Sequence, residues 1–374
     1  MSKAILLNTG WTFTKEGHDE PVTLPHTWNA VDGQDGGNDY YRGTCTYTRT
    51  LEKPELPDGG RAVLQFDGVA MTAVVSLNGE KVAEHKGGYS TFRVDITDAL
   101  HDGANELIVS VDNSDNDTVY PQKADFTFYG GIYRDVSLLV VNRNHIALDY
   151  LGGPGVQITP TVNGANADIE VKTWMEGDGE VEFSIYDAAG AEVLTGKGRD
   201  TTVTLEHPHL WDGVRDPYLY TCAVRLVLNG EVQDEVRQRF GVRSFSVDPK
   251  RGFFLNGRPY PLHGVSRHQD RKGLGNAITR EMHDEDMALI KEIGANTIRL
   301  AHYQHDQYFY DLCDEVGMVV WAEIPYISEH MPNGRENTIS QMKELIIQNY
   351  NHPCIVCWGV SNEITISTKD KQDM

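Results

Sequence analysis

Long apolar runs are missing from this sequence of 374 residues. The N-terminal stretch holds only the four-residue run AILL at positions 4–7, which is shorter than the apolar core of a secretory signal peptide. No later segment approaches the roughly 20 apolar residues that a transmembrane helix needs. We therefore expect a cytoplasmic protein that has no membrane partner.

Cysteine is also scarce, and the number of cysteines is odd. The chain has 5 of them, and their scattered spacing indicates neither a disulfide framework nor a zinc site. The one CxxC pair, Cys354 and Cys357, lies in a predicted strand, where residues three apart face opposite sides of the sheet. We expect reduced, buried thiols, no metal ligands among them and no cofactor. The full set is Cys45, Cys222, Cys313, Cys354 and Cys357.

Basic side chains are outnumbered by acidic ones. There are 33 Lys and Arg against 55 Asp and Glu, which gives a formal net charge of −22. This balance excludes a nucleic acid as the expected partner, because phosphates need a basic surface. The 40% of apolar and 9% of aromatic residues are ordinary for a globular protein, and the length predicts two or three domains.

Two β-rich regions make up the first two thirds of the chain. Residues 1–142 contain short β runs separated by turns, including the hairpin signal Asn78-Gly79, and predict a jelly-roll or similar sandwich. Residues 143–246 predict a seven-stranded immunoglobulin-like β-sandwich, since such a domain has roughly 100 residues. Cys222 has no cysteine partner at antibody-like spacing, so only the architecture is immunoglobulin-like.

From residue 247 to residue 374, apolar strands alternate with helices, a pattern typical of a parallel sheet covered by helices. In the first helix, Met287, Ile290 and Ile293 are predicted to form one apolar stripe. Gly294 and Gly317 stand where helices should end in a left-handed residue. The predicted strands cover 260–268, 297–303, 318–324 and 354–363, and the predicted helices cover 280–294, 306–317 and 339–350.

Four βα strands are half of a closed eight-stranded barrel, which takes about 250 residues. A sheet of four parallel strands that stopped there would leave an apolar edge and face uncovered. We therefore expect the first half of a (β/α)8 TIM barrel in a chain truncated within that barrel.

Polar side chains follow all four predicted barrel strands, at the ends where barrel enzymes carry their catalytic groups. Two carboxylates with histidines and aromatics, and without phosphate-binding loops, suit glycoside hydrolysis. Glu363 is the predicted proton donor, and Asn362 is placed to bind a sugar hydroxyl. The strand-end residues are Arg267, His268, Gln269, Asp270, Arg299, His302, Tyr303, Glu323, Asn362 and Glu363.

All of these residues except Glu323 lie within three of seven motifs that resemble, in the same order, those of the β-galactosidases and β-glucuronidases of glycoside hydrolase family 2. The resemblance covers nearly the whole chain and implies a sugar-binding jelly roll, an immunoglobulin-like domain and a (β/α)8 catalytic barrel. The motifs are LPHTWN (24–29), FDGV (66–69), GGIYRDVSLL (130–139), LWDGVRDPYLY (210–220), GVSRHQD (264–270), IRLAHY (298–303) and VSNE (360–363).

The resemblance also implies residue roles. Glu363 matches the family's acid/base, and Asn362 matches its substrate-binding neighbour. His268 and His302 match histidines that line the sugar subsite, and Glu323 matches a glutamate that supports the site. Asp125, seven residues before Ile132, matches an aspartate that the first domain lends to the subsite; a simple turn aspartate is the alternative interpretation.

Two departures from the family pattern limit these expectations. Family members take their nucleophilic glutamate from a later barrel strand, and no residue here matches it, so this chain alone should be inactive. The segment EIPYISEHMPNG has Ile327 where some members have a glutamate that binds a divalent metal, so no metal is expected there.

Three functions remain open. The favoured one is retaining hydrolysis of terminal β-D-galactosides, because SRHQD (266–270) leans towards β-galactosidases. A β-glucuronidase is the alternative within the family, since DFTFYGGI (125–132) fits it as well. A carbohydrate-binding protein without catalysis is the alternative from another class, motivated by the unmatched nucleophile. The expected partner is a small-molecule or oligosaccharide β-glycoside, and homo-oligomers are compatible with the family.

Overall fold

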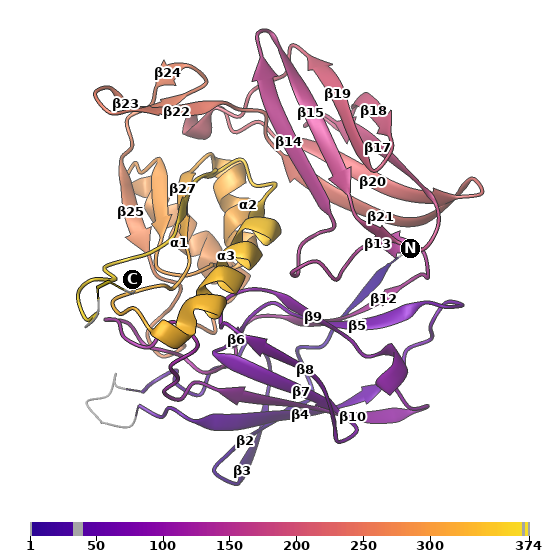
Figure 1. Cartoon of the computed structure of the whole chain (residues 1–374), viewed down its shortest axis with the longest axis vertical. Coiled ribbons are helices and arrows are strands. Elements are labelled where there is room, and N and C mark those ends of the chain that lie inside the picture. Colours follow the sequence, from indigo (N-terminus) through magenta and orange to yellow (C-terminus); the bar gives the residue numbers. More distant parts are fainter. Residues whose placement is uncertain (1, 33–39, 369–370, 373–374) are drawn as a thin grey trace.

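The computed structural model describes residues 2–32, 40–368 and 371–372. Figure 1 shows three regions: an N-terminal β-sandwich in indigo and purple, a second β-sandwich in magenta, and an α/β region in orange and yellow. The α/β region lies beside both sandwiches, and its helix α3 runs close to the N-terminal sandwich. The jelly-roll, immunoglobulin-like and partial-barrel fold class is therefore confirmed.

The N-terminal sandwich consists of antiparallel sheets around one apolar core. Strand β7 alternates buried and partly exposed residues, as expected for a strand with one face on the core. Asn78 and Gly79 have φ angles of 53° and 84°, so both adopt the left-handed conformation that a tight hairpin needs. The hairpin predicted between residues 73 and 85 is thus confirmed as β7 and β8.

One four-stranded sheet and one six-stranded sheet carry most of this sandwich. In spatial order the first sheet contains β1 (Lys3–Leu6), β12 (Val136–Val141), β5 (Arg61–Phe66) and β9 (Phe92–Asp95). The second contains β3 (His18–Val22), β2 (Trp11–Lys15), β4 (Thr44–Glu52), β10 (Ala104–Asp112), β7 (Thr72–Leu77) and β8 (Glu80–Lys86). The short pair β6 (Val69–Ala70) and β11 (Gly131–Ile132) and the 3-10 helix η1 (Thr97–Ala99) complete it.

The second sandwich has a three-stranded and a four-stranded sheet, as the immunoglobulin-like prediction requires. The three-stranded sheet contains β14 (Val156–Asn163), β15 (Asn166–Thr173) and β19 (Asp200–Glu206). The four-stranded sheet contains β18 (Glu192–Lys197), β17 (Glu180–Tyr186), β20 (Tyr220–Leu228) and β21 (Glu231–Phe240). The pair β13 (His145–Ile146) and β16 (Met175–Glu176) and the 3-10 helix η2 (Gly213–Arg215) accompany them.

An antiparallel element that the sequence analysis did not predict leads into the α/β region. It contains β22 (Phe245–Asp248), β23 (Gly252–Leu255) and β24 (Arg258–Pro259). The strand predicted over residues 260–268 is shorter in the structure, where β25 covers Gly264–Arg267.

The α/β region has four parallel strands in chain order, with three α-helices between them. The strands are β25 (Gly264–Arg267), β26 (Thr297–Leu300), β27 (Val319–Glu323) and β28 (Ile355–Gly359). The helices are α1 (Arg280–Glu292), α2 (Gln307–Val316) and α3 (Arg335–Asn349), with the 3-10 helix η3 (Pro332–Gly334) before α3.

Local sequence explains three of the six α-helix boundaries in this region. The side chain of Asp306 accepts a hydrogen bond from the backbone N–H of Tyr308 and so caps α2. Gly294 and Gly317 have φ angles of 77° and 79°, which confirms both predicted helix ends. The predicted stripe on α1 is wrong in one member: Ile293 is 67% exposed, because α1 ends at Glu292 and the chain turns away there.

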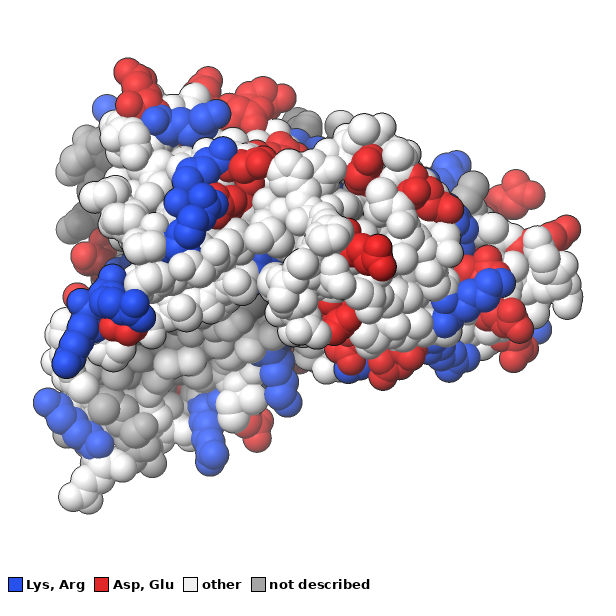
Figure 2. Space-filling model, turned by 90° about the horizontal axis from the view of Figure 1, so that it is seen from above, with Lys and Arg blue, Asp and Glu red and all other residues white. Residues whose placement is uncertain are grey.

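Surface charge on the face drawn in Figure 2 is mixed: acidic and basic side chains lie among one another around broad uncharged areas. None of the helices in the described part of the chain combines the length and the apolar character that a membrane crossing requires.

Candidate active site

The C-terminal ends of β26, β27 and β28 bring a compact polar cluster together. Arg299 of β26 occupies its centre. Its Nε lies 2.5 Å from Oε1 of Glu323, the last residue of β27. Its Nη2 donates a 2.7 Å hydrogen bond to Oδ1 of Asn362, which follows β28. Parallel neighbours end at the same edge of a sheet, so residues 24 and 63 positions away in sequence meet at one guanidinium.

Glu323 is a buried carboxylate that stays charged. It is 2% exposed, and its Oε2 lies 2.9 Å from Nδ1 of His302. Burial alone would raise the pKa of Glu323, but the hydrogen bonds from His302 and Arg299 outweigh it and hold the pKa below its usual value. Glu323 therefore anchors Arg299 and His302, and its oxygens are already engaged.

An aromatic side chain from the jelly roll covers the two predicted subsite histidines. The ring of Phe126 lies 5.1 Å from that of His268 and 6.1 Å from that of His302, measured between centroids. The two histidine rings are 5.3 Å apart. Burial, followed by the proximity of His302, lowers the pKa of His268, although Asp270 and Asp125 pull it upward. His268 is therefore a neutral hydrogen-bonding group near pH 7.

Asp125 is exposed in the loop that carries Phe126. The next residue, Phe126, packs against His268, and the negative charge of Asp125 favours a higher pKa of His268. Within the described residues its carboxylate accepts no hydrogen bond, which leaves both oxygens available to a ligand.

Glu363 lies next to the cluster but outside its hydrogen-bond network. The backbone of Asn362 is fixed on both sides: its N–H donates to the carbonyl of Tyr326 and its carbonyl accepts from the N–H of Ser328, each at 3.0 Å. Glu363 follows with a φ of 52° and an exposed side chain. Its carboxylate makes no ion pair with the described residues. A left-handed φ is costly for a glutamate, so the fixed backbone before it is what imposes this conformation.

The structure thus gathers Asn362, Glu323 and His302 around Arg299, with His268 beside them. Asp125 and Glu363 are exposed beside this group, and no residue in the described part of the chain binds either carboxylate. Sequence reasoning named Arg299 only as a strand end and did not name Phe126. The sequence signal for Arg299 was an arginine at a strand end with a carboxylate at the end of the next strand. The signal for Phe126 was its position next to Asp125.

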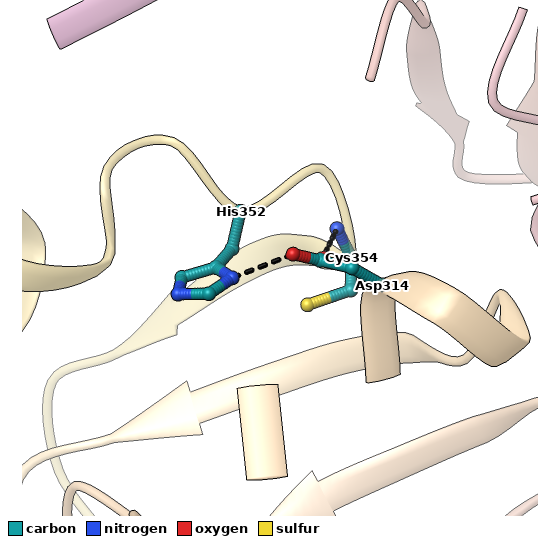
Figure 3. Close-up of side chains that lie close together, drawn as sticks. All are labelled: Asp314, His352 and Cys354. Carbon is teal, nitrogen blue, oxygen red and sulfur yellow. Dashed lines mark hydrogen bonds and ion pairs between the residues drawn. The ribbon is translucent and has the colours of Figure 1, made fainter. Parts of the chain in front are cut away.

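A second cluster, away from the strand ends, contains three side chains of types that can bind metal ions. Asp314, His352 and Cys354 each place one potential ligand atom within 4.8 Å of the others. Figure 3 shows the three side chains, which lie close together. The Asp314 oxygens already accept hydrogen bonds, from Nδ1 of His352 at 2.6 Å and from the backbone N–H of Cys354 at 3.0 Å. Burial raises the pKa of the Cys354 thiol well above its usual value, so it is not the thiolate that a metal needs.

The guanidinium of Arg243 lies beside this cluster, donating to the carbonyls of Pro353 and Ile355 at 2.5 and 2.7 Å. A buried positive charge there opposes a cation. We therefore assign the cluster of Asp314, His352 and Cys354 a structural role, joining α2 to the start of β28.

Three family models match successive parts of the chain. Residues 2–142 match the sugar binding domain of glycosyl hydrolases family 2, residues 152–243 match a second model of glycosyl hydrolases family 2, and residues 247–374 match its TIM barrel domain.

Curated relatives and solved structures agree with these matches. A β-glucuronidase of Bacteroides fragilis is 40% identical over 96% of this chain and 56% of its own length. A β-galactosidase of Thermoanaerobacter pseudethanolicus is 30% identical over 95% of this chain and 49% of its own length. The crystal structure of an FMN-binding β-glucuronidase from Facaelibacterium prausnitzii L2-6 has a TM-score of 0.96 and 48% identity, covering 99% of this chain and 60% of that one. The chain spans about half the length of the curated relatives it matches.

Proposed function

Since this chain belongs to glycoside hydrolase family 2, we propose that it forms part of a retaining β-glucuronidase, which releases terminal glucuronic acid from β-D-glucuronides. The observation that supports this substrate is the identity of 40% and 48% with relatives named as β-glucuronidases, against 30% for a β-galactosidase and 39% for a putative β-galactosidase. From the sequence alone we favoured β-galactosides as substrates; these identities favour the alternative, β-glucuronides.

The geometry supports a distinct role for each residue. Glu363 is exposed and makes no ion pair with the described residues, as suits an acid that approaches the glycosidic oxygen of a bound substrate. Asn362, oriented by Arg299, presents its amide nitrogen to a sugar hydroxyl. His268, His302 and Asp125 surround the sugar ring, and a carboxylate such as Asp125 can accept hydrogen bonds from neighbouring hydroxyls.

A retaining enzyme needs a second carboxylate about 5–5.5 Å from the acid. Glu323 is a poor nucleophile because both oxygens are engaged by Arg299 and His302. We assign the nucleophile, and the group that reads the sugar carboxylate, to the portion of the relatives that this chain does not span. Arg299 is committed to Glu323 and Asn362, so it does not read that carboxylate.

The test compares p-nitrophenyl β-D-glucuronide, β-D-galactoside and β-D-mannoside as substrates of the protein expressed from the complete reading frame. We expect kcat/KM for the glucuronide to exceed the others by about a hundredfold. Glu363→Gln should lower kcat by about two orders of magnitude or more. Glu336→Gln, an exposed glutamate at the start of α3, is the matched control and should retain activity. Preferential hydrolysis of the galactoside, or full activity of Glu363→Gln, would contradict the proposal.

A further inference from the structure

The loop that carries Asp125 has its own anchors on the jelly-roll side. The backbone N–H of Phe128 donates a 2.6 Å hydrogen bond to the hydroxyl of Tyr40, and the carbonyl of Phe128 accepts one from Asn113 at 2.9 Å. These bonds fix the base of the loop. They do not reach Asp125, whose carboxylate has no partner among the described residues.

Phe126 provides a contact from this loop to the barrel. Its ring lies 5.1 Å from His268, 5.5 Å from Tyr303 and 6.1 Å from His302, between centroids. These neighbours come from the ends of β25 and β26, so one aromatic ring touches both barrel strands that carry the subsite histidines. Aromatic pairs at such distances stabilise each other beyond simple burial.

Tyr129 provides a second contact, four residues beyond Asp125. Its hydroxyl donates a 2.9 Å hydrogen bond to Oδ2 of Asp270, just after β25. Its ring also packs on Gly275, where a Cβ atom would come within 2.7 Å of the Tyr129 ring. Gly275 has a φ of 56°, so both the close approach and the backbone conformation favour glycine there.

We propose that Phe126 and Tyr129 are positioning residues that hold Asp125 over the sugar subsite. Both side chains follow Asp125 in the sequence. They connect the loop to the ends of the barrel strands that carry His268 and His302. The inference rests on the proposed function, because it requires Asp125 to bind the sugar. Neither aromatic side chain needs to touch the substrate, since each acts by fixing where the carboxylate lies.

A double-mutant cycle separates positioning from general packing. We expect Phe126→Ala to lower kcat/KM for p-nitrophenyl β-D-glucuronide by about a hundredfold, the cost of misplacing a binding group by about 1 Å. In an Asp125→Asn background the same substitution should cause little further loss, because the group that it positions is already gone. Equal losses in both backgrounds, or no effect of Asp125→Asn by itself, would overturn the proposal.

Tyr129→Phe tests the second contact with a smaller change. Losing one hydrogen bond to a carboxylate should lower kcat/KM by about tenfold, mainly through KM, because Asp125 binds the ground state as well. Tyr308→Phe is the matched control: its hydroxyl donates a 2.8 Å hydrogen bond to Asp284 between α1 and α2, away from the loop, and its kcat/KM should not change. Equal effects of the two substitutions would overturn the role of Tyr129.

Hydrogen exchange gives a readout that does not depend on turnover. Amides in residues 123–130 should exchange faster in Phe126→Ala than in the unsubstituted protein, while the strands of both sandwiches keep their protection. Unchanged exchange in this segment would overturn the proposal. An unsubstituted protein that hydrolyses neither glucuronides nor galactosides contradicts the proposed function, whereas an active protein whose Phe126 and Tyr129 variants are fully active contradicts only the positioning.

Discussion

A single buried aspartate of helix α2 makes hydrogen bonds to two other parts of the molecule. Asp314 of α2 accepts hydrogen bonds from His352 and from the backbone of Cys354, while its backbone carbonyl accepts a 2.9 Å bond from the indole of Trp211. Burial alone would lower the pKa of His352, but the Asp314 carboxylate outweighs it and raises the pKa above its usual value. The imidazolium and the carboxylate therefore stabilise each other in the folded protein.

At the residue scale, Asp314→Ala should lower the free energy of unfolding by about 3–5 kcal/mol, because it leaves a buried partner unpaired. Asp311→Ala, in the same helix, removes an exposed carboxylate paired with Arg239 and should cost about 1 kcal/mol or less. Urea unfolding of both variants measures the difference. Equal costs would contradict the structural role of Asp314.

The same pair predicts a dependence on pH. A histidine with a raised folded-state pKa contributes its full stability below the unfolded pKa of about 6.5, and that contribution disappears as pH rises through the folded pKa. The difference between the unsubstituted protein and Asp314→Ala should therefore shrink as pH increases above about 6.5. Urea unfolding repeated across this pH range checks the direction, and a constant difference would show that His352 is not charged in the pair.

At the scale of elements, helix α3 buries a polar face against the jelly roll. Asn337, Gln341, Glu344 and Gln348 are all buried and, being four, three and four residues apart, they lie on one side of the helix. Asn337 accepts from the backbone N–H of Tyr120, and Glu344 lies 3.1 Å from Nε2 of His85. Gln348 bonds both the N–H and the carbonyl of Thr91.

Gln348 carries the largest share of these bonds, so its replacement is the sharpest test. Gln348→Leu should lower the free energy of unfolding by about 3 kcal/mol or more, because several buried groups lose their partners at about 1–3 kcal/mol each. The exposed Lys343→Leu on the same helix should change it by about 0.5 kcal/mol or less. Thermal and urea unfolding would detect the contrast, and a Gln348→Leu variant as stable as Lys343→Leu would contradict the role of this face.

The sequence predicted the helices of this region and two of their ends, but it did not predict that α3 buries a polar face. Gly294 and Gly317 end their helices as expected, because a helix end depends on the local chain. The helix over residues 339–350 was expected as well, since its residue types favour helix. That its buried face is polar depends on residues 85–91 and 120, which a helical period does not reveal. Likewise, His302, Glu323 and Asn362 were predicted from their places at the strand ends. That the guanidinium of Arg299 binds both Glu323 and Asn362 follows from the register of the parallel sheet.

At the scale of the whole molecule, the parallel sheet has two open edges among the described residues, one at β25 and one at β28. Among the described residues, β28 pairs with β27 alone, so its other edge presents unpaired backbone groups. Apolar side chains near this edge are also uncovered: Trp321 is 46%, Val360 60% and Ile366 67% exposed. An exposed, apolar edge strand favours pairing with another chain.

The 374-residue chain should therefore bind the dye ANS and self-associate at micromolar concentration. The exposed apolar side chains bind the dye, and the unpaired backbone groups of β28 can pair with a strand of a second chain. Val360→Lys should weaken the association, since a charge beside the edge opposes strand pairing. Val247→Lys is the control, because Val247 is 73% exposed on the distant hairpin strand β22 and should leave association unchanged. Sedimentation velocity measures the association of all three proteins. A chain that stays monomeric without binding dye would contradict the prediction.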